Sequence, residues 1–160
     1  MINVILTNGM VALVDDTDYE VVEPYKWHFV NGKTGGYAVT YIKGKTHYMH
    51  RLIMQPSFGM VVDHINASKL DNTRSNLRIC TSKQNHANKT IQRNNRYGFK
   101  GVSLWTNNYG KTYWRADLIC ELGGVRKHIC KLYKTKIEAV LGWNELARQY
   151  YGPFAKLNEV

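Results

Sequence analysis

A carboxylate and a histidine stand side by side near the middle of the chain, at the end of a short apolar stretch. Asp63 and His64 directly follow residues 60–62, which read Met-Val-Val. Neighbouring side chains at a strand end point in different directions, so one can hold a metal ion while the other reaches a water molecule beside it. Carboxylate oxygens suit a hard divalent cation, and a neutral imidazole can take a proton from water. The pair therefore indicates hydrolytic chemistry at a metal site.

Two asparagines further along the chain complete this candidate site. Asn76 precedes a second expected strand at residues 77–79, where its amide can bond the backbone of the loop that carries the histidine. Asn85 falls in the first turn of an expected helix, which Thr81 opens with a glutamine three residues later, so its amide oxygen can be a second metal ligand. Two protein ligands plus water are typical of Mg²⁺ at phosphate sites, and Mn²⁺ accepts the same oxygen donors. We expect one Mg²⁺ or Mn²⁺ ion in the active site.

The residues before this stretch predict a β-rich scaffold. Residues 50–54 predict about one turn of helix before Pro56, which ends it. No reactive constellation is apparent upstream of residue 50, so we interpret this region as structural. Alternating residues and glycine-containing turns at Asn31-Gly32 and Lys43-Gly44 predict strands at 11–14, 26–30, 36–42 and 46–49.

Positive charge is concentrated in the second half of the chain. The formal net charge is +10, but residues 1–48 contain four Lys or Arg against five Asp or Glu. Residues 93–136 contain ten Lys or Arg, interleaved with tyrosines and tryptophans, against two acids. Such a block is typical of a nucleic-acid-binding surface, and a solvated basic face is the alternative on charge alone. A membrane-surface helix fits less well, because the charges lie in β-like sequence.

The overall composition indicates a folded protein in a reducing compartment. An apolar fraction of 44% and four tryptophans are typical of globular domains. No apolar run approaches the roughly 20 residues needed to cross a bilayer, and the N-terminus lacks a secretory signal. Cys80, Cys120 and Cys130 fit neither a disulfide framework nor a zinc site, so we interpret them as core residues. We expect a cytoplasmic protein without membrane attachment or an obligate protein partner.

The C-terminal part predicts a small sheet packed on one helix. A polar, basic segment at residues 89–97 predicts a linker. A capping box at Thr135 and Glu138 opens a helix that ends near Tyr151, before Gly152-Pro153. Apolar residues at helical spacing give this helix a face that packs on the sheet. Three strands are expected before it, at residues 100–105, 113–119 and 125–132.

The central stretch resembles the HNH endonuclease family, with its ββα-metal motif, and in particular its phage and intron-borne homing branch. The resemblance implies His64 as general base, Asp63 and Asn85 as metal ligands, and Asn76 as the orienting residue. Asn85 stands where the family name, HNH, has its second histidine. This replacement recurs in the homing branch and argues against zinc. His86, the next residue along the helix, points about 100° away from Asn85. We therefore interpret it as a phosphate contact or a bystander, not as a metal ligand. The matching pieces are His50-Arg51-Leu52-Ile53, Asp63-His64-Ile65-Asn66, Asp71-Asn72, Ser75-Asn76-Leu77-Arg78 and Gln84-Asn85.

The C-terminal part resembles the AP2 domain, a three-stranded sheet packed on one helix that reads DNA. Copies of this domain are found attached to HNH homing nucleases, so the two resemblances support each other. The matching pieces include Gly98-Phe99-Lys100-Gly101-Val102, Trp114-Arg115-Ala116 and Tyr133-Lys134-Thr135.

Strand alternation sorts the faces of this sheet. Trp114, Ala116 and Leu118 are expected to face the helix, together with Val102 and Leu104 on the first strand. The third strand is ambiguous, because two consecutive residues, Ile129 and Cys130, cannot both face inward without a bulge. A sheet of this size can enter the major groove, and basic residues outside it can track phosphates. The expected DNA contacts are Arg51, Arg93, Arg96, Lys100, Trp105, Tyr113, Arg115, Arg126 and Lys127.

We therefore predict an α+β protein with a nuclease domain at residues 1–90 and an AP2-like DNA-binding domain at 98–160, joined by a basic linker at 89–97. The nuclease domain has a β-rich lead-in at 1–55 and the ββα-metal motif at 60–90. The expected activity is site-specific, homing-type hydrolysis of double-stranded DNA, with a monomer nicking one strand, in a bacterium or a phage-infected host cell. A non-catalytic DNA-binding regulator is the alternative, and an RNA-binding protein is a weaker third. Because His64 must be neutral to act, activity is expected to fall below about pH 6.5.

Overall fold

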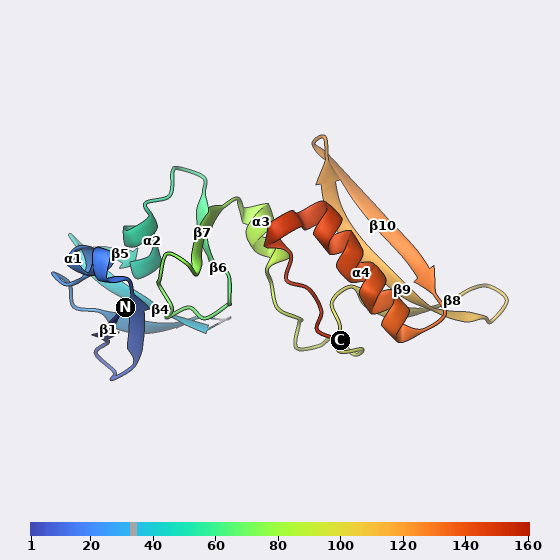
Figure 1. The fold of residues 1–160 in the computed structure, drawn as a ribbon, viewed down its shortest axis with the longest axis horizontal. Helices are drawn as coiled ribbons and strands as arrows, with labels where there is room; N and C mark the ends of the chain where they lie inside the picture. The colour runs from blue at the N-terminus through green and yellow to red at the C-terminus, as the bar shows by residue number, and fades with distance from the viewer. Residues whose placement is uncertain (33–34) are drawn as a thin grey trace. The chain divides into compact units, whose positions relative to one another are not determined.

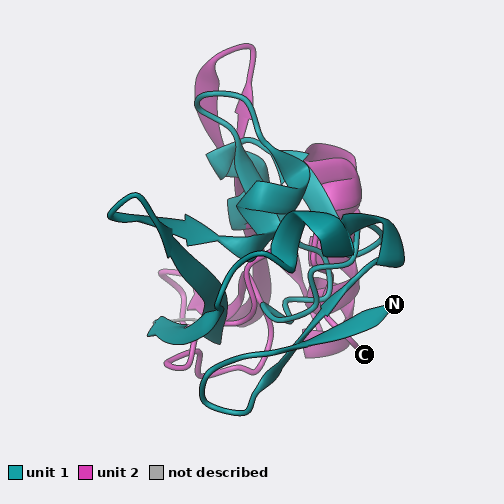
Figure 2. Cartoon of the chain, turned by 90° about the vertical axis from the view of Figure 1, so that its left-hand side faces the viewer, with its two compact units in different colours: residues 1–86 teal, residues 87–160 magenta. Residues whose placement is uncertain are grey.

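Short antiparallel strands and a few helices make up the chain in the computed structural model, which describes residues 1–32 and 35–160 (Figure 1). The chain divides into two compact units, Met1–His86 and Ala87–Val160 (Figure 2). Each unit has its own cluster of buried apolar side chains. The fold is therefore mixed α and β with several small sheets, as the sequence predicts at this coarse level.

The first unit contains three small antiparallel sheets. At the turn between two of its strands, Lys43 and Gly44 have φ angles of 49° and 75°, the left-handed pair that a two-residue hairpin requires. The turn expected at Asn31-Gly32 lies instead within a strand, and the residues that follow lie outside the described ranges. The sheets are β1 (Ile2–Ile5) with β2 (Val11–Val14); β3 (His28–Gly32), β4 (Gly35–Ile42) and β5 (Lys45–Tyr48) in that order; and β6 (Val61–His64) with β7 (Leu77–Cys80).

The helices of the first unit are short and connect the strands of one sheet to those of the next along the chain. An acidic segment expected as a turn forms a 3₁₀ helix, η1 (Asp16–Asp18), which continues into α1 (Tyr19–Val22). The helical turn expected before Pro56 is present as α2 (Met49–Met54). Apolar residues from these segments pack around Trp27 and Met49, which are almost fully buried. This core fixes α2 against the strands that lead to the candidate site.

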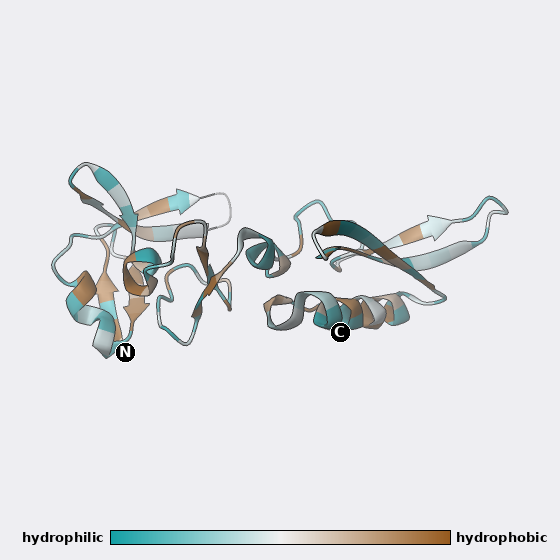
Figure 3. Cartoon of the chain, turned by 90° about the horizontal axis from the view of Figure 1, so that it is seen from above, coloured by the Kyte–Doolittle hydropathy of each residue, from teal (hydrophilic) through white to brown (hydrophobic). Residues whose placement is uncertain are grey.

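The second unit is a three-stranded antiparallel sheet with one helix along one of its faces (Figure 3). The predicted capping box is present, since Thr135 Oγ1 accepts from the Glu138 N–H and Glu138 accepts from the Thr135 N–H. The sheet order is β10 (Val125–Tyr133), β9 (Thr112–Leu122), β8 (Val102–Thr106), and the helices are α4 (Lys136–Tyr151) and η2 (Gly152–Phe154).

One prediction about side chains in the second unit is wrong, and another needs a qualification. Leu104 lies on the helix-facing side as predicted, since it pairs with Trp114, but it is 43% exposed because β8 is an edge strand and α4 packs mainly on β9. Cys130 is exposed, because it pairs with Asp117 on the face away from the helix. Ile129 packs into the core instead, so the strand alternates without a bulge. Cys80 and Cys120 are buried, as predicted.

Candidate active site

The expected order of strand, loop, strand and helix is present around the candidate site. Strands β6 and β7 pair antiparallel, with Asp63 opposite Arg78 and His64 opposite Leu77. Helix α3 (Ser82–Ala87) follows directly. Its start is capped reciprocally, because the Thr81 N–H donates to the glutamine at position 84 (2.8 Å) and Thr81 Oγ1 accepts from that residue's N–H (3.2 Å). The local signals in the sequence therefore predict this segment well.

Asp63 is 2% exposed, and a guanidinium group binds it. Arg78 donates from Nε and Nη2 to Asp63 Oδ2, at 2.9 and 2.7 Å. Burying a carboxylate is costly unless it is paired, so this cross-strand pair offsets the cost of burying the expected metal ligand. Arg78 has no role that is predicted from the sequence. Its position opposite Asp63 follows from strand register, which local sequence patterns do not determine.

His64 is fully buried, and the amide of Asn72 lies against its imidazole. Asn72 Nδ2 donates to Met49 Sδ (3.4 Å) and to the Leu70 carbonyl (3.2 Å), which leaves Asn72 Oδ1 facing His64 Nε2 at 3.4 Å. This arrangement favours the tautomer with the proton on Nε2, so Nδ1 is the nitrogen that takes up a proton. Asn72 thus orients the imidazole of His64, a role that is not predicted from the sequence.

Aromatic rings from the upstream region surround this histidine. The ring of His50 lies 5.0 Å from that of His64, and Tyr37 lies 5.4 and 6.2 Å from the two histidines. Tyr48 contacts His50 at 5.6 Å. These rings come from β4, β5 and α2, so the upstream region supplies the packing around His64. The four residues Tyr37, Tyr48, His50 and His64 are called the ring cluster below.

Burial within the ring cluster changes the acid–base properties of both histidines. Burial, with a smaller contribution from the charge of Lys69, lowers the pKa of His64 to about 4. Burial and the neighbouring His64 lower the pKa of His50 to about 3. His64 therefore stays neutral well below its ordinary pKa, and the expectation that activity falls below about pH 6.5 must be corrected downward. The imidazole can therefore accept a proton at physiological pH, although a pKa this low makes it a weaker base than an ordinary histidine.

Asn76 joins the two ends of the loop between β6 and β7. Its Oδ1 accepts from the Asn66 N–H at 2.9 Å, and its Nδ2 donates to the Asp71 carbonyl at 2.8 Å. The side chain of Asp71 in turn accepts from the Asn66 amide and the Thr73 hydroxyl, both at 2.8 Å. Asn76 thus makes the backbone contacts that its position suggested, and they fix the loop that follows His64.

The same loop is anchored to the N-terminal hairpin. Main-chain bonds of 2.8 Å join Leu13 to Leu70 and to Asn72. Arg74 donates from Nε and Nη2 to the buried Asp18 at 2.8 and 2.7 Å. The acidic segment at η1 therefore holds the far side of the loop, an interaction that no local pattern in the sequence indicated.

Asp63 and Asn85 supply oxygen atoms of the kind that a hard divalent cation prefers. Asn85 is half-buried in the first turn of α3. Burial raises the pKa of the Cys80 thiol, and the negative charge of Asp63 adds to the increase. A hydrogen bond with the Asn85 backbone opposes it, so Cys80 interacts with both expected ligand residues. Within residues 1–32 and 35–160, no three His, Cys, Asp or Glu side chains gather as a metal site. Carboxylate and amide oxygens suit Mg²⁺ or Mn²⁺ better than zinc.

The expected DNA contacts lie in several parts of the chain. Arg51 is exposed in α2, with Nη1 3.5 Å from the Met60 carbonyl, and Arg93 and Arg96 are exposed between α3 and β8. On the outer face of the second unit's sheet, the rings of Trp105 and Tyr113 lie 6.2 Å apart.

Arg115 lies on the same outer face and is paired there. Its Nε is 2.5 Å from an oxygen of Asp117, whose other oxygen lies 2.7 Å from His128 Nε2. Arg126 pairs with Glu121 in the sheet register, whereas Lys127 pairs with the buried Cys120. Because side chains alternate along a strand, Lys127 is on the face opposite Arg115 and Arg126. The three residues therefore cannot act together on one face of the sheet.

The ammonium group of Lys100 makes hydrogen bonds within the second unit. Its Nζ donates to the carbonyls of Ala87 (3.1 Å) and Lys156 (2.8 Å) and lies 5.2 Å from the Trp143 ring. Burial lowers the pKa of this lysine to about 8. Its ammonium group is committed to main-chain carbonyls, so Lys100 is left out of the proposed DNA contacts.

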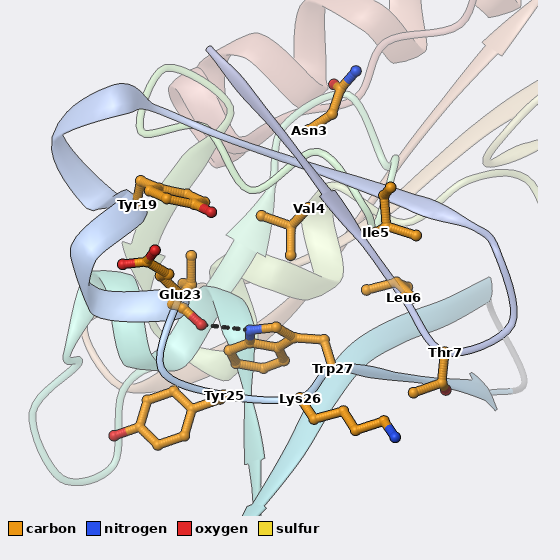
Figure 4. A pocket seen from close by; sticks show the side chains of 11 residues that line it. Asn3, Val4, Ile5, Leu6, Thr7, Tyr19, Glu23, Tyr25, Lys26 and Trp27 are labelled. Atoms are coloured by element: carbon orange, nitrogen blue, oxygen red, sulfur yellow. Dashed lines mark hydrogen bonds between the residues drawn. The ribbon is translucent and has the colours of Figure 1, made fainter.

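The first unit also has a cleft that the candidate site residues do not line. It has a volume of about 430 Å³ and is lined by residues of β1 and of the segment from Tyr19 to Trp27 (Figure 4). The indole of Trp27 closes one side and donates to the Val22 carbonyl at 2.9 Å. None of the candidate catalytic or metal-binding residues lines it, so the cleft is not the proposed site. Across the described parts of the chain, no helix has the length and apolar character needed to span a membrane.

Comparisons with known proteins agree on one family. A family profile described as HNH endonuclease matches residues 47–87, which include Asp63, His64, Asn76 and Asn85. The chain is also similar to an uncharacterized HNH endonuclease of Acanthamoeba polyphaga mimivirus. The two are 32% identical over 158 residues, which cover 95% of this chain and 76% of the viral protein. No solved structure matches the chain significantly.

Proposed function

The chain belongs to the HNH endonuclease family, and we propose that it is a homing-type endonuclease that cuts double-stranded DNA at a specific site. The family indicates nuclease activity on DNA, and HNH endonucleases generally use a divalent metal. The observation that best supports the proposal is the buried, neutral imidazole of His64, held by Asn72 directly beside Asp63.

In the proposed reaction, His64 Nδ1 takes a proton from a water molecule as its oxygen attacks the scissile phosphorus. The bond to the 3′ oxygen breaks, that oxygen takes a proton from solvent water, and the products carry 5′-phosphate and 3′-hydroxyl ends. Asp63 and Asn85 would hold one Mg²⁺ or Mn²⁺ ion, which when bound polarises the phosphate and stabilises the leaving oxygen. Asn76 positions the loop, and Asn72 holds the imidazole in the required tautomer. With one such site per chain, a monomer nicks one strand.

The second unit is proposed to supply the DNA affinity, as an AP2-like domain. Two features support this role: its three-stranded sheet packed on one helix, and its thirteen Lys or Arg against five Asp or Glu. The sheet's outer face presents aromatic and arginine side chains that can contact a groove. The proposed contacts are Trp105, Tyr113, Arg115 and Arg126 on that face, with Lys127, Arg51, Arg93 and Arg96 as contacts to phosphates.

A plasmid-nicking assay tests the activity. The full-length protein with Mg²⁺ is expected to convert supercoiled DNA to the open circle, and His64→Ala should reduce the rate by about 10²–10⁴-fold, the usual contribution of a positioned base. DNA binding by the variant should stay at the wild-type level. Nicking by His64→Ala at the wild-type rate would show that this histidine is not the base.

A non-catalytic DNA-binding regulator is the second candidate. The pairing of Asp63 with Arg78 favours it, because the guanidinium occupies the carboxylate expected to hold the metal. The same assay separates the two functions. A regulator binds DNA but leaves plasmid intact over a range of Mg²⁺ and Mn²⁺ concentrations, whereas the proposed nuclease nicks it.

A further inference from the structure

Lys69 places a positive charge beside the ring cluster. It lies in the loop between β6 and β7 and is half-buried. Its Nζ is 5.7 Å from the centre of the Tyr37 ring, and that ring contacts His50 and His64. The stem of Lys69 passes Gly35, where a Cβ would lie 3.6 Å from Lys69 Cγ. The ammonium group is therefore held next to the rings that surround the proposed base.

This charge has no paired carboxylate. Within residues 1–32 and 35–160, no acid lies within ion-pair distance of Lys69 Nζ. Asp63 acts on the ammonium only through space and already binds Arg78. The same field reaches both buried histidines, since the Lys69 charge contributes to lowering the pKa of each. Burial of an ammonium group without a counter-ion is unfavourable, so an anion at this position would be stabilised.

We propose that Lys69 Nζ binds a non-bridging oxygen of the scissile phosphate while His64 activates the water. An ammonium group has three donors and no acceptor, which suits it to a phosphate oxygen as a compact point charge. Lys69 stays protonated throughout and exchanges no proton. Its contribution is to stabilise the negative charge that grows on the phosphate in the transition state. This inference rests on the proposed nuclease function and adds a catalytic residue to it.

Three variants of the full-length protein test whether Lys69 contributes to the rate of DNA nicking. Lys69→Gln removes the charge, Lys69→Arg keeps it, and Lys45→Gln removes an exposed charge from the same unit as a matched control. Removing one preorganised donor commonly costs about 10²–10³-fold in rate. We expect Lys69→Gln to lower the single-turnover nicking rate at saturating protein by about 100-fold, with the dissociation constant for the DNA within threefold of that of Lys45→Gln. Lys69→Arg should recover most of the rate.

Inorganic phosphate gives a readout that does not require cleavage. In NMR spectra of the histidine rings, added phosphate should shift the His50 and His64 signals saturably in the wild type and in Lys45→Gln, but not in Lys69→Gln. If Lys69→Gln nicks DNA and binds phosphate like Lys45→Gln, the role of Lys69 is overturned while the nuclease function stands. If the wild type never nicks DNA but binds phosphate only with Lys69 present, the nuclease function fails and the phosphate site stands. Absence of any saturable phosphate shift together with unchanged nicking would exclude the site.

Discussion

At the scale of single residues, the Asp63–Arg78 pair determines how the expected metal ligand behaves without a metal. Arg78 Nε and Nη2 both donate to the same carboxylate oxygen, Oδ2. The pair is mostly shielded from solvent, with the two side chains 2% and 17% exposed. Removal of one partner of such a pair is much more costly than its replacement as a whole, because the remaining charge is buried without compensation.

The first prediction concerns this pair. Arg78→Met should lower the free energy of unfolding by about 3 kcal/mol in metal-free buffer, because the buried Asp63 carboxylate loses the guanidinium that binds it. The double variant Asp63→Asn, Arg78→Met should recover part of that loss. Urea unfolding monitored by tryptophan fluorescence measures both. A double variant no more stable than the single one would contradict the view that the lost guanidinium contact to the Asp63 carboxylate causes the loss of stability.

At the scale of elements, the local order of the site could be predicted from the sequence, but its surroundings could not. The Thr81 cap marks the start of α3, and the short apolar segment before Asp63 marks β6, because both signals lie within a few residues. The ring cluster depends instead on pairings between β4, β5, α2 and β6, which lie far apart in sequence. Arg78 and Lys69 were missed for the same reason. Their roles depend on strand register and on where a loop crosses a sheet.

The ring cluster also predicts how stability changes with pH. The folded-state pKa values of His50 and His64, about 3 and about 4, lie below the unfolded value of about 6.5. Between these values the unfolded chain binds more protons, so the contribution to stability is complete above pH 6.5 and is lost as the pH falls toward 4. From pH 7 to pH 5 each histidine should cost about 2 kcal/mol.

The second prediction uses this difference. His50→Phe keeps a ring in contact with Tyr37 and Tyr48 but cannot take up a proton. Its loss of stability between pH 7 and pH 5 should therefore be about 2 kcal/mol smaller than that of the wild type. Urea unfolding at several pH values, without metal, gives the comparison. His47→Phe, at a half-buried position outside the cluster in β5, is the control and should keep the wild-type pH dependence. Equal pH dependence for His50→Phe and the wild type would show that His50 is not a buried neutral group in the folded protein.

At the scale of the whole molecule, the excess positive charge and the proposed catalytic residues belong to different units. Residues 1–86 contain nine Lys or Arg and seven Asp or Glu, together with the proposed catalytic residues. Residues 87–160 contain thirteen and five, so most of the net charge of +10 belongs to the second unit. Non-specific affinity for DNA arises mainly from counterions released at phosphates. The second unit should therefore determine how strongly the protein binds, and the first how fast it cuts.

The third prediction separates the two faces of the second unit's sheet. Arg126→Gln and Lys127→Gln remove the same charge from adjacent exposed positions, but only Arg126 shares the outer face with Trp105 and Arg115. If that face binds DNA, Arg126→Gln should reduce the slope of log affinity against log salt by about 0.9, the value for one lost phosphate contact. Lys127→Gln should change it by less than half as much. Fluorescence anisotropy with a labelled duplex at several salt concentrations measures both slopes. Equal slopes for the two variants would mean that the DNA does not distinguish the faces of the sheet, and the binding surface would then have to be sought among the exposed arginines at positions 93 and 96.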